Sequence, residues 1–235
     1  MKYENQELVE QVDKVANEIL SQKHSNHHRD HFFPALIDKL NLKIGVEVGV
    51  DKGEFSAHLL GKSKLEKLYC VDTWQDDFGS NYKPGFYDPN GNNRYIEAAT
   101  NLKEFAERII LAKGTSVEMA NQFSNALPGK EVDFCYIDGD HTYEGVYVDI
   151  RAWLPKLKIG GILAGHDYKY KEDAKNSGIK AIDGDQLDYG VKIVVDGFCK
   201  RYGYPLRVVG GRILSWFFVK NREAEDPLNV YNLRS

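Results

Sequence analysis

The sequence has few cysteines, no long apolar run and no excess of basic residues. Cys70, Cys135 and Cys199 lie far apart and form no CxxC pair, which argues against a disulfide framework and against a cysteine-based zinc site. No apolar stretch is long enough to cross a bilayer, and the first twenty residues are too charged for a secretory signal. The net charge of −4 gives no electrostatic reason to expect nucleic acid. We therefore expect a cytoplasmic protein without a nucleic-acid or membrane partner.

The composition is that of a soluble globular protein, with 42% hydrophobic and 28% charged residues. A chain of 235 residues commonly forms one domain, so we expect a single domain across residues 1–235. Apolar residues between Leu8 and Leu20 recur at helical spacing and predict an amphipathic helix. We divide the domain into an N-terminal helical extension (1–40), a core (43–220) and a tail (221–235).

Short runs rich in β-branched and aromatic residues alternate with helical patterns through the core. This alternation predicts an α/β fold with a doubly wound, mostly parallel, Rossmann-like sheet covered by helices on both faces. Two apolar runs around Gly210 and Gly211 predict an antiparallel C-terminal hairpin. The expected parallel strands lie within residues 43–50, 67–74, 108–115, 132–139 and 160–167.

Acidic residues and histidines follow the fourth and fifth of these runs. Residues 136–145 read YIDGDHTYEG, and residues 165–168 read GHDY. Because ligands of open parallel sheets bind outside the carboxyl ends of the strands, both segments are expected to face one crevice. A turn rich in Asp and Gly can also serve only to cap a helix, so the pairing of the two segments is what favours a functional site.

A glycine-containing turn follows the first run. Glu47, Gly49 and Gly53 stand in the pattern Glu-x-Gly-x-x-x-Gly before an expected helix. The glycines let the backbone approach a ligand, and the helix N-terminus offers unpaired N–H groups. Asp72 ends the second run and is placed to accept hydrogen bonds from ribose hydroxyls, although it could instead cap a helix or anchor a loop. This combination predicts a ligand that contains a nucleoside.

Two other segments carry weaker indications. Histidines recur three to four apart in residues 24–31, but no carboxylate or cysteine stands at a ligand-like offset, so a metal site there is disfavoured. Residues 75–93 are rich in Gly, Pro, Asn and Asp, which is typical of a lid or a binding loop. Together with residues 168–190, these segments are expected to frame the site of a second substrate.

In combination, these motifs resemble the class I S-adenosylmethionine-dependent methyltransferases, and more narrowly the branch of macrocin-type sugar O-methyltransferases. The resemblance covers roughly residues 43–220 and includes KGTS at 113–116. It implies S-adenosyl-L-methionine as cofactor, with Gly49 and Gly53 beside the methionine part, Asp72 on the ribose, and Thr115 or Ser116 near the adenine. The implied cofactor-binding residues are Glu47, Gly49, Val50, Gly53, Asp72, Thr73, Trp74, Thr115, Ser116 and Asp138.

The same resemblance implies metal-assisted methyl transfer to a hydroxyl of a sugar or glycan. Asp138, His166 and Asp167 would hold a divalent metal ion, Mg²⁺ or Mn²⁺, that helps to deprotonate the hydroxyl. His166 departs from the all-acid pattern of the family, and it either shifts the site towards a transition ion or serves the substrate. The proton acceptor would be Asp140 or His141, with His141 favoured because imidazole titrates near neutral pH.

Other functions stay open at this point. His141, His166 and one Asp could form the two-histidine, one-carboxylate iron site of a hydroxylase. The chain could also be a binding module that keeps the cofactor pocket without catalysis. A nicotinamide dehydrogenase is disfavoured by the glycine spacing. The expected acceptor is a small molecule or glycan, small phenols are an alternative, and the sequence leaves open whether the chain forms a homo-oligomer.

Overall fold

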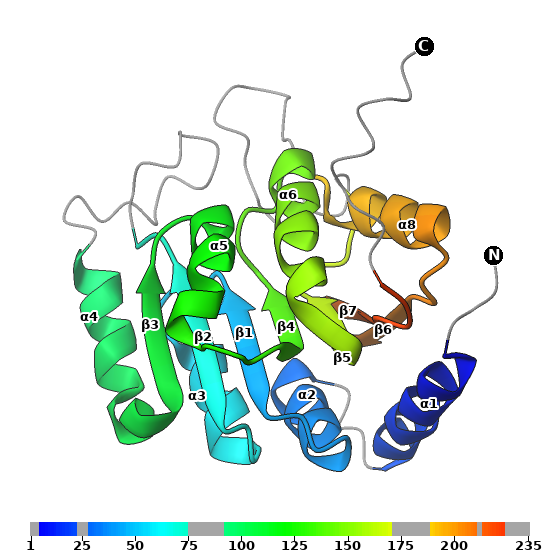
Figure 1. Cartoon of the computed structure of the whole chain (residues 1–235), viewed down its shortest axis with the longest axis horizontal. Coiled ribbons are helices and arrows are strands. Elements are labelled where there is room, and N and C mark those ends of the chain that lie inside the picture. The colour runs from blue at the N-terminus through cyan, green and yellow to red at the C-terminus, as the bar shows by residue number, and fades with distance from the viewer. Residues whose placement is uncertain (1–4, 23–27, 75–91, 171–188, 211–212, 224–235) are drawn as a thin grey trace.

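The computed structural model describes residues 5–22, 28–74, 92–170, 189–210 and 213–223. Within them a seven-stranded sheet carries helices on both faces (Figure 1). The strands are β1 (Ile44–Val48), β2 (Lys67–Asp72), β3 (Ile109–Lys113), β4 (Val132–Ile137), β5 (Leu157–Gly165), β6 (Arg207–Gly210) and β7 (Leu214–Val219). The helices are α1 (Gln6–Ser21), α2 (Arg29–Lys39), α3 (Glu54–Lys62), α4 (Asn92–Asn101), α5 (Ser116–Ala126), α6 (Tyr143–Trp153) and α8 (Val191–Tyr202), with 3-10 segments η2 (Lys103–Arg108) and η3 (Leu154–Lys156).

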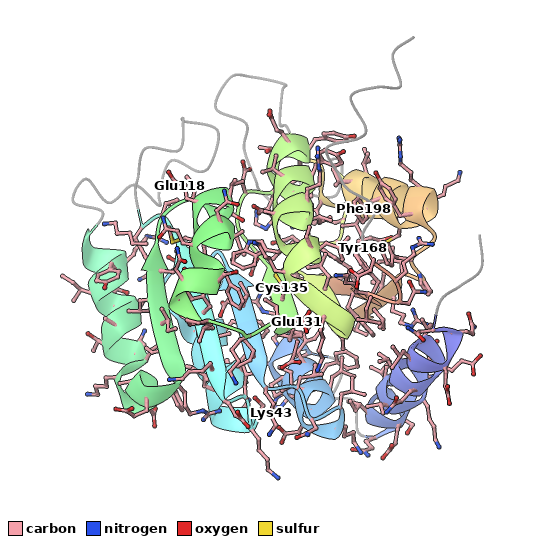
Figure 2. All side chains as sticks on the ribbon, in the orientation of Figure 1. Lys43, Glu118, Glu131, Cys135, Tyr168 and Phe198 are labelled. Carbon is pink, nitrogen blue, oxygen red and sulfur yellow. The ribbon has the colours of Figure 1, made fainter. Side chains whose placement is uncertain are left out.

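The strand order is β3-β2-β1-β4-β5-β7-β6. Strands β1 to β5 pair in parallel, whereas β7 pairs antiparallel with both β5 and β6. This confirms the Rossmann-like sheet with an antiparallel C-terminal hairpin. The strand order reverses between β1 and β4, which is where open sheets of this kind form their ligand crevice. In Figure 2, Lys43 and Glu118 mark the opposite ends of the strands, and Glu118 lies at the carboxyl ends.

Two hydrophobic cores lie on the two faces of the sheet. Helices α5, α6 and α8 pack over one face, and α1, α2, α3 and α4 pack over the other. Strand β4 contributes to both cores, because Cys135 and Ile137 point into the first while Phe134 and Tyr136 point into the second. A strand buried on both faces reads as a continuous apolar run, which is why the sequence of β4 shows almost no polar alternation.

The N-terminal helices are packed onto the second core. As the apolar spacing predicts, residues 6–21 form a helix, which buries four side chains on one face and is tied to the sheet by an ion pair between Asp13 and Arg207. Helix α2 inserts Phe32 and Phe33 against Phe217 of β7. This packing fixes the first turn of α2 near the carboxyl end of β4. No helix among the described residues is long and apolar enough to cross a membrane.

Candidate active site

The glycine turn after β1 runs against the start of the loop that follows β4. Gly49 has a φ of 87°, and a Cβ atom at this position would lie 2.2 Å from the carbonyl oxygen of Asp138. Gly53 also has a positive φ, of 77°, and forms the N-cap of α3. Only glycine fits at position 49, since both the backbone conformation and the adjacent chain exclude a side chain. The turn therefore brings bare backbone to the crevice.

Asp72, at the end of β2, is hydrogen-bonded to the loop after β1 and to the loop after β2. Its Oδ2 accepts a hydrogen bond of 2.8 Å from the backbone N–H of Asp51, and its Oδ1 accepts one of 2.8 Å from the N–H of Trp74. Burial raises the pKa of Asp72 above its usual value. A carboxylate has about four lone-pair sites, so the anchoring role leaves acceptor capacity for a ligand. The structure therefore shows Asp72 as a loop anchor, the role that the sequence analysis gave as the alternative to ribose binding.

Several other residues expected around the cofactor have structural partners of their own. The side chains of Val50 and Trp74 are buried in the second core. Thr115 is the N-cap of α5 and forms a capping box with Glu118. The hydroxyl of Ser116 accepts a hydrogen bond of 2.9 Å from the indole N–H of Trp153. Val50 and Trp74 are therefore available to a ligand mainly through their backbone atoms, because their side chains are buried.

Glu47 lies beneath the crevice in β1. Glu47 is 2% exposed, and its carboxyl accepts a hydrogen bond of 2.5 Å from the hydroxyl of Ser56 in α3. Burial raises the pKa of Glu47 to about 8, against the opposing influence of Ser56 and the positive charge of Arg29. Glu47 is therefore mostly protonated at neutral pH, and it links the strand before the glycine turn to the helix after it.

A cluster of two acids and two histidines forms where β4 and β5 end; we call it the acid–histidine cluster (Asp138, His141, His166 and Asp167). His141 Nε2 lies 3.3 Å from Asp138 Oδ1 and 3.2 Å from Asp167 Oδ2. His166 Nδ1 lies 3.7 Å from Asp138 Oδ1 and 3.3 Å from Asp167 Oδ2. All three residues expected to bind metal are therefore close together, and His141 joins them.

Electrostatics within this cluster favour charged forms. Burial opposes the positive charge on His141, but the two carboxylates outweigh it and raise the pKa of His141 to about 9. Burial likewise opposes the negative charge on Asp167, but His141 and His166 outweigh it and hold the pKa of Asp167 well below its usual range. Asp167 also has a left-handed backbone with a φ of 54°, a conformation that non-glycine residues adopt mainly at constrained sites.

Two basic residues that the sequence analysis did not identify bind the outer oxygens of the cluster. Arg29 in α2 donates from Nη1 to Asp138 Oδ2 at 2.6 Å, and its guanidinium lies 4.6 Å from the ring centroid of Phe55. Lys169 Nζ lies 2.8 Å from Asp167 Oδ1. Arg29 stands alone in a histidine-rich segment 109 residues before Asp138, so no local pattern could identify it. Lys169 is two residues after Asp167, so a positive charge so near to an expected metal ligand could have identified it in the sequence.

The remaining candidates lie elsewhere. Asp140 is exposed, and its Oδ1 accepts a hydrogen bond of 2.9 Å from the N–H of Thr142 at the start of α6. His28 caps α2 through its Nδ1 and is exposed. Among the described residues, the group that could hold a metal consists of Asp138, His141 and Asp167. Residues 24–27, 75–91 and 171–188, which include most of the segments expected to frame the acceptor, lie outside the described part of the chain.

Comparison with known proteins places this arrangement in a family. The family described as "Methyltransferase domain" matches residues 46–168, from β1 to just after β5. A curated relative, the uncharacterised protein y4gI of Sinorhizobium fredii, is 27% identical over 106 residues, which are 45% of this chain and 10% of that protein. The chain thus spans about a tenth of the length of this relative.

Solved structures share the whole fold at low sequence identity. An O-methyltransferase from Bacillus cereus in complex with SAH has a TM-score of 0.59 and 13% identity, with 91% of each chain covered. A candidate caffeoyl-CoA O-methyltransferase from Staphylococcus aureus has a TM-score of 0.57 and 17% identity, again with 91% of each covered. The O-methyltransferase TomG from Streptomyces achromogenes, in complex with SAM, has a TM-score of 0.54 and 14% identity, with 91% of this chain and 90% of TomG covered. On the match to its central 46–168 segment, which is more than half of its length, the chain belongs to the methyltransferase domain family.

Proposed function

We propose that the chain is an S-adenosyl-L-methionine-dependent O-methyltransferase. The observation that carries this proposal is the position of the glycine turn between Asp72 and the acid–histidine cluster, at one edge of the sheet of a methyltransferase-family domain. From β2 to β5 the edge spans three strand intervals, about 14 Å at 4.8 Å each, which suits a nucleoside carrying an amino-acid chain. The similar structures in complex with SAH and SAM support the same cofactor.

Different residues along this edge of the sheet would bind different parts of the cofactor. Asp72 would accept hydrogen bonds from the ribose hydroxyls, and the backbone at Gly49 would pass beside the methionine part. Glu47, neutral and bonded to Ser56, would hold the turn without adding a charge next to the cofactor. The acceptor hydroxyl would then face the acid–histidine cluster, since the cofactor occupies the other side of the crevice. We propose a sugar or glycan hydroxyl as acceptor on the likeness of the motifs.

The acid–histidine cluster fits a divalent cation. Its carboxylate oxygens and ring nitrogens converge to within 3.2–3.7 Å of one another across the acid–histidine pairs. Asp138 and Asp167 would hold Mg²⁺ or Mn²⁺ together with a histidine, either His166, as the sequence indicates, or His141, which groups with the two acids in the structure. A bound cation would polarise the acceptor hydroxyl. Asp140 or His141, in the turn after β4, would take the proton as the methyl group is transferred. His141 could do so only in its uncharged form, which a bound cation would favour, because the two carboxylates alone raise its pKa to about 9.

Incubation with isotopically labelled S-adenosyl-L-methionine and a panel of sugars, nucleotide sugars and phenols tests the proposal. Mass spectrometry should detect a labelled methyl ether that decreases when a chelator is added. Asp167→Asn should abolish the metal-stimulated part of the transfer and leave cofactor affinity within about threefold. Glu131→Gln, an exposed acid that precedes β4 at the opposite end of the strand, should behave as wild type. Absence of cofactor binding by calorimetry would rule out the proposal.

One observation also fits a second function. His141, His166 and Asp167 lie together, as a two-histidine, one-carboxylate iron site requires. Such a hydroxylase would consume 2-oxoglutarate and O₂ and would not need Gly49 and Asp72 in their present form. Iron-dependent turnover of 2-oxoglutarate without S-adenosyl-L-methionine would identify it.

A further inference from the structure

One face of helix α4 lies along the glycine turn that follows β1. Arg94 Nη1 donates a hydrogen bond to Asp51 Oδ1, and Asn101 Nδ2 donates one of 2.9 Å to the backbone oxygen of Lys52. Between them on the helix, Glu97 Oε2 lies 2.7 Å from Lys52 Nζ. Positions 94, 97 and 101 are three and four residues apart, so they share a face of the helix. Helix α4 therefore holds the middle of the turn through three side chains.

Asp51, in the middle of the turn, is bound by three different groups. Its backbone N–H donates to Asp72 Oδ2 at 2.8 Å, its backbone oxygen accepts a hydrogen bond of 2.8 Å from the indole N–H of Trp74, and its carboxylate accepts one from Arg94. Asp51 has a left-handed φ of 51°, a conformation that is costly for a residue other than glycine. These contacts therefore fix a strained residue between the two glycines of the turn.

The ion pair of Arg94 with Asp51 acts on the turn more than on overall stability. Its side chains are 23% and 50% exposed, and ion pairs exposed to water stabilise a protein little. Burial, and to a smaller extent the negative charge of Asp51, raises the pKa of Asp72. Arg94 offsets that negative charge and restricts the motion of Asp51. A binding loop that is already ordered loses less conformational entropy when its ligand binds.

We propose that Arg94 is a positioning residue for the cofactor, which holds Asp51 and thereby keeps the glycine turn in the conformation that receives S-adenosyl-L-methionine. The inference rests on the proposed function for the identity of the ligand. Arg94 acts through Asp51 and needs no contact with the ligand. It lies 43 residues after Asp51, so no local sequence pattern connects the two.

Calorimetric titration of the full-length protein with S-adenosyl-L-homocysteine tests the inference. Arg94→Met should weaken binding by about fivefold or more, and Arg94→Lys, which retains the charge, should weaken it less. Lys52→Met is the matched control, because it removes an ion pair between the same turn and the same helix without touching Asp51, and it should stay within about twofold of wild type. Urea denaturation should give the same free energy of unfolding for both methionine variants, so that a difference in affinity reports on the turn.

Asp51→Asn tests the same contact from the turn, since asparagine tolerates the left-handed conformation. The double variant Arg94→Met, Asp51→Asn should bind no more weakly than the weaker single variant, because both changes remove one interaction. Additive losses in the double variant, or wild-type affinity in Arg94→Met, would overturn the inference while leaving the proposed function intact. A wild-type protein that does not bind S-adenosyl-L-homocysteine would refute the proposed function, and the inference with it.

Discussion

Left-handed backbone positions gather around the crevice. Gly49, Asp51, Gly53, Trp74 and Asp167 all have positive φ and all follow the carboxyl ends of β1, β2 or β5. For residues other than glycine this conformation costs on the order of 1–3 kcal/mol each, and it persists where the surrounding structure enforces it. For Asp51 and Trp74, the surrounding structure includes the carboxylate of Asp72, which accepts a hydrogen bond from the backbone N–H of each.

Gly49→Ala should lower both stability and cofactor affinity more than the same substitution at a glycine with a left-handed backbone outside the site. The new Cβ would combine left-handed strain with a contact of 2.2 Å to the carbonyl oxygen of Asp138. We expect a loss of more than about 2 kcal/mol in the free energy of unfolding, together with loss of S-adenosyl-L-methionine affinity. Gly129→Ala is the matched control, because Gly129 has a φ of 68° with nothing within 4 Å of the added atom. Urea denaturation and calorimetry measure the two effects, and equal losses in both variants would contradict the crowding at position 49.

The protonation of Glu47 predicts a dependence of stability on pH. The pKa of Glu47 is about 8 in the folded protein against an ordinary value of about 4.5 in the unfolded chain, so between these values the unfolded chain releases a proton that the folded chain keeps. Stability should therefore fall as pH rises from 4.5 to 8, by up to about 1.4 kcal/mol per pH unit from this group. Glu47→Gln should lose less stability than the wild type between pH 5.5 and 8.5 in urea denaturation. Parallel curves for the two proteins would show that Glu47 is ionised in the folded state.

At the scale of elements, helix α2 is attached to the site by the side chain of Arg29. Arg29 reaches from its first turn across Phe55 to Asp138 at the end of β4. Its side chain is 23% exposed and that of Asp138 is 16% exposed, so the pair is mostly shielded from water. Helix α2 therefore supplies a direct partner to the acid–histidine cluster.

Arg29→Met should remove the shortest ion pair of the Asp138 carboxylate, at 2.6 Å. Removing one member of a buried ion pair commonly costs about 3–5 kcal/mol, and the partial exposure here reduces our expectation to roughly 2–3 kcal/mol. Arg201→Met, an exposed arginine of α8, should change the free energy of unfolding by less than about 0.5 kcal/mol. In the double variant Arg29→Met, Asp138→Asn, the loss should be smaller than the sum of the single losses, because the charge that Arg29 neutralises is gone. Additive losses would show that Arg29 acts independently of Asp138.

Helix α5 allows a structural and a cofactor role to be separated at Thr115. The capping box with Glu118 predicts that Thr115→Ala costs about 1 kcal/mol of stability. If the hydroxyl serves the cap alone, the affinity for S-adenosyl-L-methionine should remain within about twofold of wild type by calorimetry. Ser116→Ala provides the comparison, since Ser116 binds Trp153 and stands at the other position considered for the adenine. A tenfold loss of affinity in Thr115→Ala would place this threonine on the cofactor.

The sequence was informative wherever function and fold depend on local patterns. The parallel strands, the helix at residues 54–62 and the hairpin around Gly210 follow from apolar periodicity and glycine, which act over a few residues. The proximity of Asp138 to His166 and Asp167 follows from parallel pairing of β4 and β5. Arg29 could not be predicted, because its partner is set by how α2 packs on α3 and the sheet. The loop-anchoring bonds of Asp72 depend on the same kind of tertiary contact.

At the scale of the whole molecule, both hydrophobic cores share the same sheet. Strand β4 has side chains in each core and pairs with β1 and β5, so separating either helical layer exposes strands on which the other layer depends. The candidate site is formed at the carboxyl ends of strands on both sides of the point where the strand order reverses, between β1 and β4. Folding and site formation should therefore be cooperative across the chain.

Tryptophan fluorescence can test this cooperativity, because Trp74 and Trp153 lie in different cores. A variant that retains only Trp74 and a variant that retains only Trp153 should each show a fluorescence transition in urea that coincides with the far-UV circular dichroism of the same protein. The S-adenosyl-L-homocysteine product, at a hundredfold excess over its Kd, should add about 2.7 kcal/mol to the free energy of unfolding reported by either tryptophan, since the ligand binds only the folded protein. A helical layer that unfolded separately would instead give two midpoints, and the ligand would then shift only the transition of the layer that closes the crevice.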